Sequence, residues 1–271
     1  MEYEKVAENF LELASFQRLR ILIKLVERSR KRLEPFAKEL DATKQEVHRN
    51  LIRLEHSGLI SKDKEGRYAL TTFGRVTCLQ LPTTLFLSQH LDYFEDHDFG
   101  NIPHKYIMRC GQLAFGTRIK GITKTLEKWK DIYKNADEYI YEILPEIPGD
   151  LFDPLIKKVK TGVKFQYIVS EHASVPQGRK EKLKKSGFYK LIEKGLIERK
   201  MRKFVTVIIV LNEKEACVFF PNLNGEADLT EMFYGNDYQF HEWCIDYFRD
   251  RWSDADPVSY THLTLPTNRE V

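Results

Sequence analysis

The sequence predicts a multi-domain α/β protein, and three patterns along the chain support this class. Apolar residues recur at helical spacing three times between residues 15 and 57, ahead of a short hairpin pattern. A long apolar helix is predicted after residue 71. Beyond residue 103, strand-like and helical segments alternate, as they do in α/β domains. The predicted parts are residues 1–75, a linking helix and hinge at 76–100, an α/β domain at 101–254 and a non-native tail at 255–271.

Residues 15–29 and 33–40 are each predicted to form a helix, because their apolar side chains fall on one face. Asp41 then interrupts the pattern. Thr43 and Glu46 have the T-x-x-E spacing of a capping box, so a third helix is expected to begin there. The apolar positions of the first two helices are Leu19, Leu22, Ile23, Val26, Leu33, Phe36, Ala37 and Leu40.

The third predicted helix has an apolar inner face and a basic outer face. Val47, Leu51 and Leu54 repeat at helical spacing and are expected to pack inward. Gly58 is placed to end this helix in the left-handed conformation, and residues 59–70 have the pattern of a two-stranded hairpin. The polar side chains left on the outer face and at the hairpin tip are Lys44, Gln45, His48, Arg49, Arg53 and Arg67.

These polar side chains are of the types that bind DNA. Arginine can donate two hydrogen bonds to guanine, glutamine can pair with adenine, and a single helix fits the major groove. An arginine beside a hairpin tip can contact a phosphate or the minor groove. Residues 1–75 hold 16 Lys and Arg against 12 Asp and Glu, whereas the rest of the chain holds 27 against 28. The sequence therefore predicts a winged helix-turn-helix that binds double-stranded DNA, with a winged helix that binds only another protein as the alternative.

A long apolar helix is predicted after the hairpin, beginning at Thr71 or Thr72 and interrupted at Pro82. We expect it to form a homodimer interface, because two DNA half-sites require two reading helices related by a twofold axis. Packing on the chain's own C-terminal domain is the alternative. Residues 96–103 are rich in Gly, Asn and Pro and are predicted to form a hinge. The apolar stripe consists of Val76, Leu79, Phe86, Leu87, Leu91 and Phe94.

The C-terminal part is predicted to be an α/β domain. Residues 139–144 and 163–169 are strand-like and flank a helical segment at 151–160, which is the order of a parallel βαβ unit. Residues 205–211 and 216–220 predict an antiparallel hairpin. Crevices open at the carboxyl edge of parallel strands, so we expect a small-molecule effector there. The candidate effector residues are Glu146, Glu171 and His172.

Composition excludes several other classes of protein. The chain is 42% hydrophobic and 31% charged, as soluble globular proteins are, and its apolar runs are much shorter than the roughly 20 residues that cross a bilayer. Its acidic start differs from a secretion signal, so a cytoplasmic protein without membrane contact is expected. The basic run at residues 28–32 could lie along phosphates or form a solvated turn. Residues 259–271 look like translated adapter sequence and are left out of the fold prediction.

Five segments carry a resemblance to a known family. They are TKQEVHRNLIRLEHSGLI, YALTTFGR, HDFGNIPHKYIMRCGQL, VKFQYIVSE and WCIDYFRDRW. In these segments the chain resembles archaeal winged-helix transcriptional regulators that carry a methanogenesis-regulator middle domain, a group with relatives among the TrmB-type sugar regulators. The resemblance implies a dimeric DNA-binding repressor or activator. It also implies a C-terminal effector domain similar to half of a phospholipase-D-like fold.

An enzyme is not expected. Phosphodiesterases of the phospholipase-D type need a histidine followed two residues later by lysine, and none of the eight histidines has lysine there. The G-x-S-x-G, P-loop and G-x-G-x-x-G patterns are missing from the sequence, and its four cysteines form no C-x-x-C pair. His90, His97 and His104 are interpreted as solvated rather than metal-binding, because Gly100 and Pro103 should separate the third from the others. No cofactor or metal is therefore expected.

Overall fold

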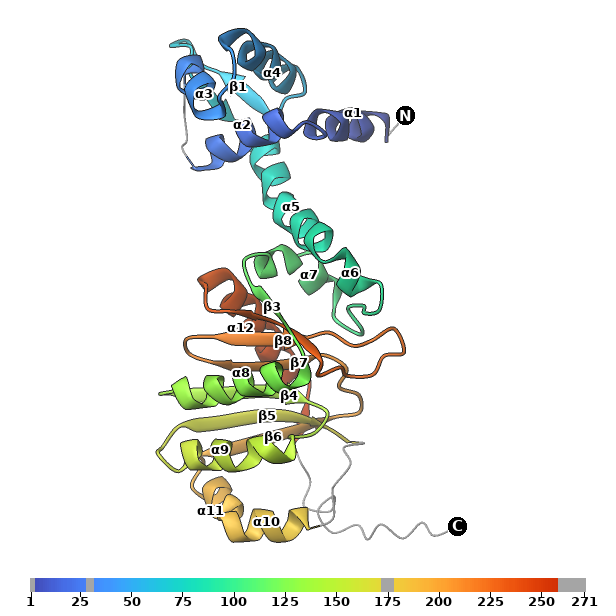
Figure 1. Ribbon diagram of the computed structural model, residues 1–271, viewed down its shortest axis with the longest axis vertical. Coiled ribbons are helices and arrows are strands. Elements are labelled where there is room, and N and C mark those ends of the chain that lie inside the picture. The colour runs from blue at the N-terminus through green and yellow to red at the C-terminus, as the bar shows by residue number, and fades with distance from the viewer. Residues whose placement is uncertain (1–2, 28–31, 172–177, 258–271) are drawn as a thin grey trace. The chain divides into compact units, whose positions relative to one another are not determined.

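The computed structural model describes residues 3–27, 32–171 and 178–257 (Figure 1). The chain divides into two compact units, Met1–Thr84 and Leu85–Val271. None of the helices in the described ranges combines the length and the apolarity that a membrane crossing requires.

The N-terminal unit consists of helices and one hairpin. Its elements are α1 (Glu4–Leu13), α2 (Phe16–Glu27), α3 (Leu33–Leu40), α4 (Lys44–His56), β1 (Ile60–Lys62), β2 (Tyr68–Leu70) and the first part of α5 (Thr72–Gln89). Leu22 of α2, Phe36 of α3 and Leu51 of α4 are fully buried and lie in one apolar core. Because the three helices bury their apolar stripes against one another, the opposite face of α4 is left to solvent. The basic run predicted at residues 28–32 lies outside the described residues, apart from Arg32.

The turn before α4 and the end of α4 have the predicted geometry. The N–H of Glu46 donates to Thr43 Oγ1 at 3.2 Å, and the N–H of Thr43 donates to Glu46 Oε2 at 2.9 Å. This reciprocal pair is the predicted capping box, which is confirmed. Gly58 follows α4 with a left-handed φ of 75°, as also predicted.

The hairpin leads directly into α5. Thr71 Oγ1 accepts a hydrogen bond from the N–H of Gly74 at 3.0 Å, which caps the helix as predicted. A Cβ atom added at Gly74 would lie 1.9 Å from the carbonyl oxygen of Leu59, so only glycine fits this contact. α5 continues through Pro82, so the predicted interruption there is wrong. Proline removes one backbone hydrogen bond of the helix, but the helical conformation continues to Gln89.

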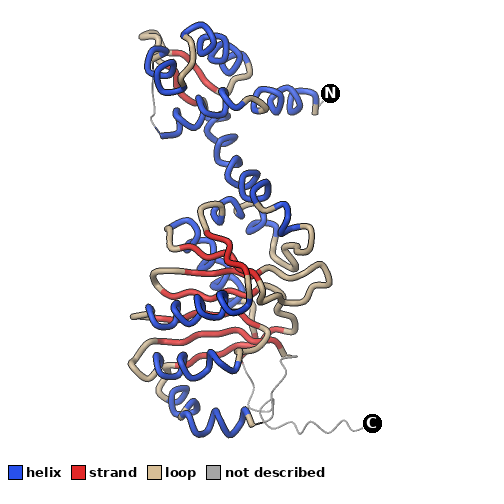
Figure 2. The backbone as a smooth tube through the Cα atoms, in the orientation of Figure 1, coloured by secondary structure: helices blue, strands red, loops and turns tan. Residues whose placement is uncertain are grey.

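The C-terminal unit is built on a mixed sheet that has eight strands within the described residues (Figure 2). The strands are β3 (Thr117–Lys120), β4 (Tyr139–Leu144), β5 (Lys164–Ser170), β6 (Ile197–Arg202), β7 (Ile208–Asn212), β8 (Ala216–Phe219), β9 (Glu231–Gly235) and β10 (Asp256–Pro257). Their order is β10-β6-β5-β4-β7-β8-β9-β3. β4, β5 and β6 are parallel, and the other neighbours pair antiparallel. The predicted strands, crossover helix and β7–β8 hairpin are confirmed, whereas the β3–β9 pair was not predicted.

Helices cover both faces of this sheet. They are α6 (Leu91–Phe94), α7 (His104–Ile107), the 3₁₀ helix η1 (Cys110–Leu113), α8 (Ile122–Asn135), α9 (Gly149–Val159), α10 (Arg179–Ser186), α11 (Phe188–Glu193) and α12 (Tyr238–Ser253). α8 and α9 lie on one face and α12 on the other (Figure 1). The unit has two apolar cores. One core includes Trp129 of α8 and Phe165 of β5, and the other includes Trp243 of α12 and Phe220, which follows β8.

The segment predicted as a hinge packs against the sheet. His97 is 8% exposed and Ile102 is 4% exposed. The N–H of Asp98 donates to the carbonyl of Pro221 at 3.1 Å, and Gly100 adopts a left-handed φ of 55°. The Gly, Asn and Pro content of residues 96–103 therefore belongs to a tight, packed turn.

Candidate nucleic-acid interface

α4 presents a polar face to solvent. Its apolar residues Val47, Leu51 and Leu54 are at most 1% exposed, because they pack against the rest of the N-terminal unit. Helical geometry then directs the residues between them outward. The capping box sets where the helix begins, and so fixes which side chains lie on its first two turns. The exposed ones are Lys44, Gln45, His48 and Arg49.

This face offers hydrogen-bond donors that the protein itself does not use. Within the described part of the chain, the side chains of Gln45, His48 and Arg49 have no hydrogen-bond or ion-pair partner. Lys44 Nζ lies 3.9 Å from the carboxylate of Glu34, and both side chains are more than half exposed. Exposed pairs of this length contribute little, so Lys44 is also available to an external acceptor.

Arg53 is the exception on α4. It donates to the carboxylate of Glu12 on α1, from Nε to Oε2 at 2.9 Å and from Nη2 to Oε1 at 2.6 Å. The next residue at this edge of the helix, Asn50, donates from Nδ2 to Gln17 Oε1 at 2.8 Å. The edge of α4 nearest α1 is therefore occupied by intramolecular contacts, while the centre of its outer face is open.

Arg67 also has partners of its own. Its Nε donates to Asp63 Oδ2 at 2.8 Å, and its Nη2 donates to Glu65 Oε2 at 3.0 Å. These contacts stabilise the hairpin turn, so the guanidinium is shared rather than free. Lys62 and Lys64 are exposed on the same hairpin and were missed by the sequence analysis. Their place within a predicted hairpin tip was the signal that could have identified them.

Two of the predicted effector residues, Glu146 and Glu171, lie just beyond the ends of parallel strands. Glu146 follows β4 and Glu171 follows β5, and both are exposed. The backbone N–H of Glu171 donates to the carbonyl of Arg202 at 2.9 Å, which extends the β5–β6 pairing by one residue. His172 lies outside the described residues.

A surface hollow of about 500 Å³ opens at the amino end of β4, the opposite end from the predicted effector site. Glu215 is 4% exposed there and accepts hydrogen bonds from Tyr234 Oη at 2.6 Å and Asn135 Nδ2 at 2.7 Å. Lys128 Nζ lies 3.5 Å from the Glu215 carboxylate and 3.8 Å from the centre of the Tyr234 ring. The buried carboxylate of this hollow is thus already satisfied by its neighbours.

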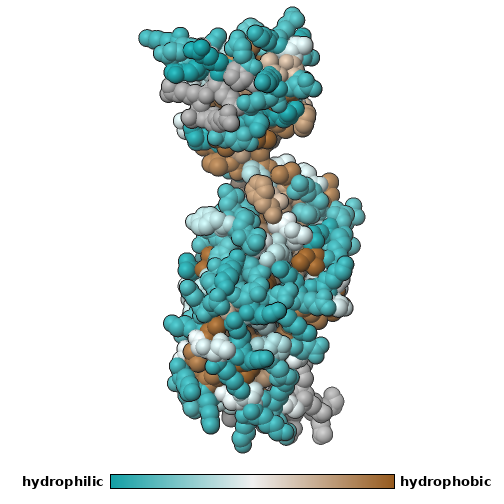
Figure 3. All heavy atoms as spheres, turned by 60° about the vertical axis from the view of Figure 1, so that its left-hand side comes forward, coloured by the Kyte–Doolittle hydropathy of each residue, from teal (hydrophilic) through white to brown (hydrophobic). Residues whose placement is uncertain are grey.

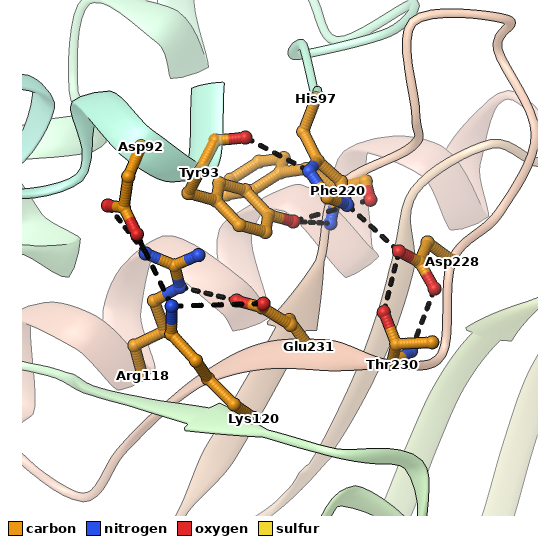
Figure 4. Close-up of polar contacts among 9 residues, drawn as sticks. All are labelled: Asp92, Tyr93, His97, Arg118, Lys120, Phe220, Asp228, Thr230 and Glu231. Atoms are coloured by element: carbon orange, nitrogen blue, oxygen red, sulfur yellow. Dashed lines mark hydrogen bonds and ion pairs between the residues drawn. The ribbon is translucent and has the colours of Figure 1, made fainter. Parts of the chain in front are cut away.

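A cluster of aromatic and charged side chains fastens α6 to the edge of the sheet (Figure 4). The ring of Tyr93 stacks on the ring of His97 with 3.9 Å between centroids, and Arg118 lies 4.9 Å from the same Tyr93 centroid. His97 Nε2 lies 3.0 Å from Asp228 Oδ2, and His97 Nδ1 lies 3.0 Å from the carbonyl oxygen of Tyr93. Both nitrogens of the imidazole are therefore engaged.

Arg118 completes this cluster by joining α6 to β3 and β9. It donates to the Asp92 carboxylate at 2.7 Å and to Glu231 Oε2 at 2.5 Å. Hydrogen bonds from Arg118 and Lys120 lower the pKa of the Asp92 carboxyl to about 2. Because α6 follows α5 in the chain, the cluster fixes the C-terminal end of the α5–α6 segment on the sheet. Among the described residues, no three histidine, cysteine or acidic side chains gather as a metal site.

One family model matches the N-terminal part of the chain. Residues 8–85 match the family model described as the HVO_A0261 N-terminal domain. The matched segment contains α2, α3, α4, the hairpin and most of α5. No curated protein matches the sequence.

Three solved structures are similar at low identity. TrmBL2, an archaeal chromatin protein described with a novel mode of DNA binding, is 16% identical with a TM-score of 0.42, over 90% of this chain and 94% of that chain. NucT from Helicobacter pylori is 10% identical with a TM-score of 0.41, over 53% of this chain and 98% of that chain. Nuc from Salmonella typhimurium, a phospholipase D family member, is 12% identical with a TM-score of 0.39, over 53% of this chain and 98% of that chain.

Proposed function

We propose that this protein is a DNA-binding transcriptional regulator of the TrmB type, and that its N-terminal unit is a winged helix-turn-helix. One observation carries the proposal. α4 is capped at Thr43 and presents Gln45, His48 and Arg49 to solvent without internal partners. A capped helix whose first two turns carry free donors is suited to the major groove, where the N-terminal residues of the helix contact base edges.

The side chains divide into two roles. Arg49 and Gln45 are proposed to read bases, since each can make two hydrogen bonds to a purine edge. Lys44 and His48 lie near the start of α4, where the helix dipole also favours phosphate. The remaining proposed contacts are to phosphates or the minor groove, from Arg53 of α4 and from Arg67, Lys62 and Lys64 of the hairpin.

A homodimer is proposed because one reading helix covers a single half-site. The first half of α5 supports this, since Phe73, Val76 and Leu79 are 46%, 52% and 68% exposed. Figure 3 shows hydrophobic side chains at the surface around α5. Apolar side chains so exposed on one helix are typical of a surface that a partner covers.

The C-terminal unit is proposed as an effector domain that binds a small molecule. Glu146, Glu171 and His172 remain the candidate ligand residues, because they follow parallel strands. The cluster around Tyr93 and His97 supports a link to DNA binding, since it ties the α5–α6 segment to β3 and β9. A ligand at the carboxyl ends of β4 and β5 would have to act through β7, β8 and β9 to reach this cluster.

The proposal is tested by selecting duplexes from a random library and measuring binding to the selected and to mixed-sequence duplex. Arg49→Ala and Gln45→Ala should each weaken binding to the selected duplex by about 1 to 3 kcal/mol and relax its sequence preference. Lys160→Ala is the control, because it removes an exposed positive charge on the C-terminal unit. Equal weakening of both duplexes by the α4 variants would contradict base reading.

A protein-interaction module is the second candidate function, and it is favoured only by the modest charge excess of the N-terminal unit. Salt dependence separates the two candidates. Binding to duplex DNA through several phosphates should weaken steeply as salt rises. A surface that docks a protein partner gives no such duplex binding at any salt concentration.

A further inference from the structure

Glu12 of α1 and Arg53 of α4 form a two-point ion pair between residues 41 positions apart in the chain. The Arg53 side chain is 51% exposed, whereas the Glu12 side chain is 14% exposed. The guanidinium thus lies at the surface with the carboxylate beneath it. Hydrogen bonding from Arg53 is the main cause that lowers the pKa of the Glu12 carboxyl, which keeps the pair charged at neutral pH.

The carboxylate of Glu12 has a second arginine partner. Arg18 Nε lies 3.2 Å from Glu12 Oε2, and the Arg18 side chain is 9% exposed. Arg18 also donates to the backbone carbonyls of Glu12 at 2.6 Å and Leu11 at 3.0 Å. If Arg53 moves away, Glu12 still has a buried positive partner and the end of α1 is still attached. The cost of an unpaired buried charge is therefore avoided.

Arg53 also lies beside the residues of α4 that are proposed to contact DNA. It follows Arg49 by one helical turn and lies at the edge of the exposed face of α4. A phosphate presents two oxygens to a guanidinium with the same geometry as a carboxylate. Arg53 can therefore exchange Glu12 for a phosphate without changing the kind of contact it makes.

On the basis of the DNA-binding function proposed above, we propose that Arg53 has two alternative partners, Glu12 in the free protein and a DNA phosphate in the complex. Glu12 then limits the affinity for DNA, because the Arg53–Glu12 pair must open before the phosphate contact forms. α1 is thereby coupled to DNA binding, since its orientation decides whether Glu12 reaches Arg53.

The full-length protein with Glu12→Gln tests this inference. The substitution removes the carboxylate charge that competes for Arg53, so the phosphate contact forms without an ion pair being opened first. Because the complex makes the same phosphate contacts in both proteins, the slope of log affinity against log salt should be unchanged, and affinity should rise by up to about five-fold, the value of an exposed ion pair. Binding is measured by fluorescence anisotropy on a labelled mixed-sequence duplex over a range of salt concentrations, with circular dichroism to verify that the helices remain folded.

Two matched variants separate a specific from a general charge effect. Glu8→Gln removes the same charge from the same helix, and Glu8 is exposed and has no partner within the described ranges. It should change affinity much less than Glu12→Gln does. In a protein that also carries Arg53→Ala, the Glu12→Gln substitution should have no further effect.

Each outcome bears on the inference. Tighter binding by Glu12→Gln that disappears with Arg53→Ala supports the exchange of partners. Unchanged or weaker binding by Glu12→Gln overturns it, as does a gain that persists without Arg53. If the unsubstituted protein binds no duplex at low salt, the proposed function itself fails, which is a different result from a normal affinity that Glu12→Gln leaves unchanged.

Discussion

Glu142 allows a prediction whose size follows from the structure. It lies in the middle of β4 and is fully buried. Its Oε1 accepts hydrogen bonds from Trp129 Nε1 at 2.8 Å and from the hydroxyl of Tyr133, while its Oε2 has no hydrogen-bond partner among the described residues. Burial raises the pKa of the Glu142 carboxyl to about 7, although the hydrogen bonds from Tyr133 and Trp129 oppose the shift.

A raised pKa in the folded state makes the C-terminal unit less stable as pH rises. An exposed glutamate has an ordinary pKa of 4.5, so the folded protein holds a proton between pH 4.5 and about 7 that the unfolded protein releases. The stability contributed by the neutral carboxyl is complete below pH 4.5 and is lost as pH rises through about 7. The difference between these pKa values corresponds to about 3 kcal/mol in the free energy of unfolding.

Glu142→Gln should remove this loss, because glutamine keeps the shape of the side chain and carries no charge. The free energy of unfolding of the variant minus that of the parent should increase by about 3 kcal/mol between about pH 4.5 and about pH 8.5. Tryptophan fluorescence in a denaturant titration reports this unit selectively, since Trp129, Trp243 and Trp252 all lie in it.

The exposed Glu146, just beyond the same strand, provides the control. Glu146→Gln should leave the pH profile parallel to that of the parent. A Glu142→Gln profile that is also parallel to the parent would refute the reasoning, because Glu142 would then release its proton at the same pH in the folded and unfolded states.

Two further predictions concern packing. Gly74→Ala should destabilise the N-terminal unit by about 3 kcal/mol in thermal melts followed by circular dichroism, since the new Cβ would lie 1.9 Å from the backbone oxygen of Leu59; an unchanged melting temperature would contradict this. His97→Ala should destabilise the C-terminal unit by about 2 kcal/mol and speed hydrogen exchange near Asp228, because the stacking on Tyr93 and two polar contacts are lost. Faster exchange elsewhere, with none near Asp228, would show that the cluster does not hold this edge.

Local features were the ones that the sequence could predict. The capping box at Thr43 and Glu46 and the left-handed Gly58 depend on residues within a few positions of each other, so spacing alone identified them. The outward direction of Gln45 and Arg49 followed from the apolar positions on the opposite face of the same helix.

Long-range contacts account for what the sequence could not predict. The spacing of Arg53 along α4 predicts a side chain that is free to contact DNA. In the structure this side chain binds Glu12, which is 41 residues away in the chain. The hinge-like composition of residues 96–103 does not reveal that His97 meets Asp228, 131 residues away. The pairing of β3 with β9 joins strands more than 100 residues apart, and neither strand has a strong pattern of its own.

Site-directed crosslinking tests most directly whether the outer face of α4 enters the major groove. All four cysteines are buried, so a Gln45→Cys substitution would introduce one exposed thiol on this face. The expectation is a disulfide between this position and a duplex whose bases carry thiol tethers in the major groove, and none from Lys160→Cys on the C-terminal unit. Binding of the duplex without a crosslink at position 45, or with equal crosslinking from position 160, would contradict it.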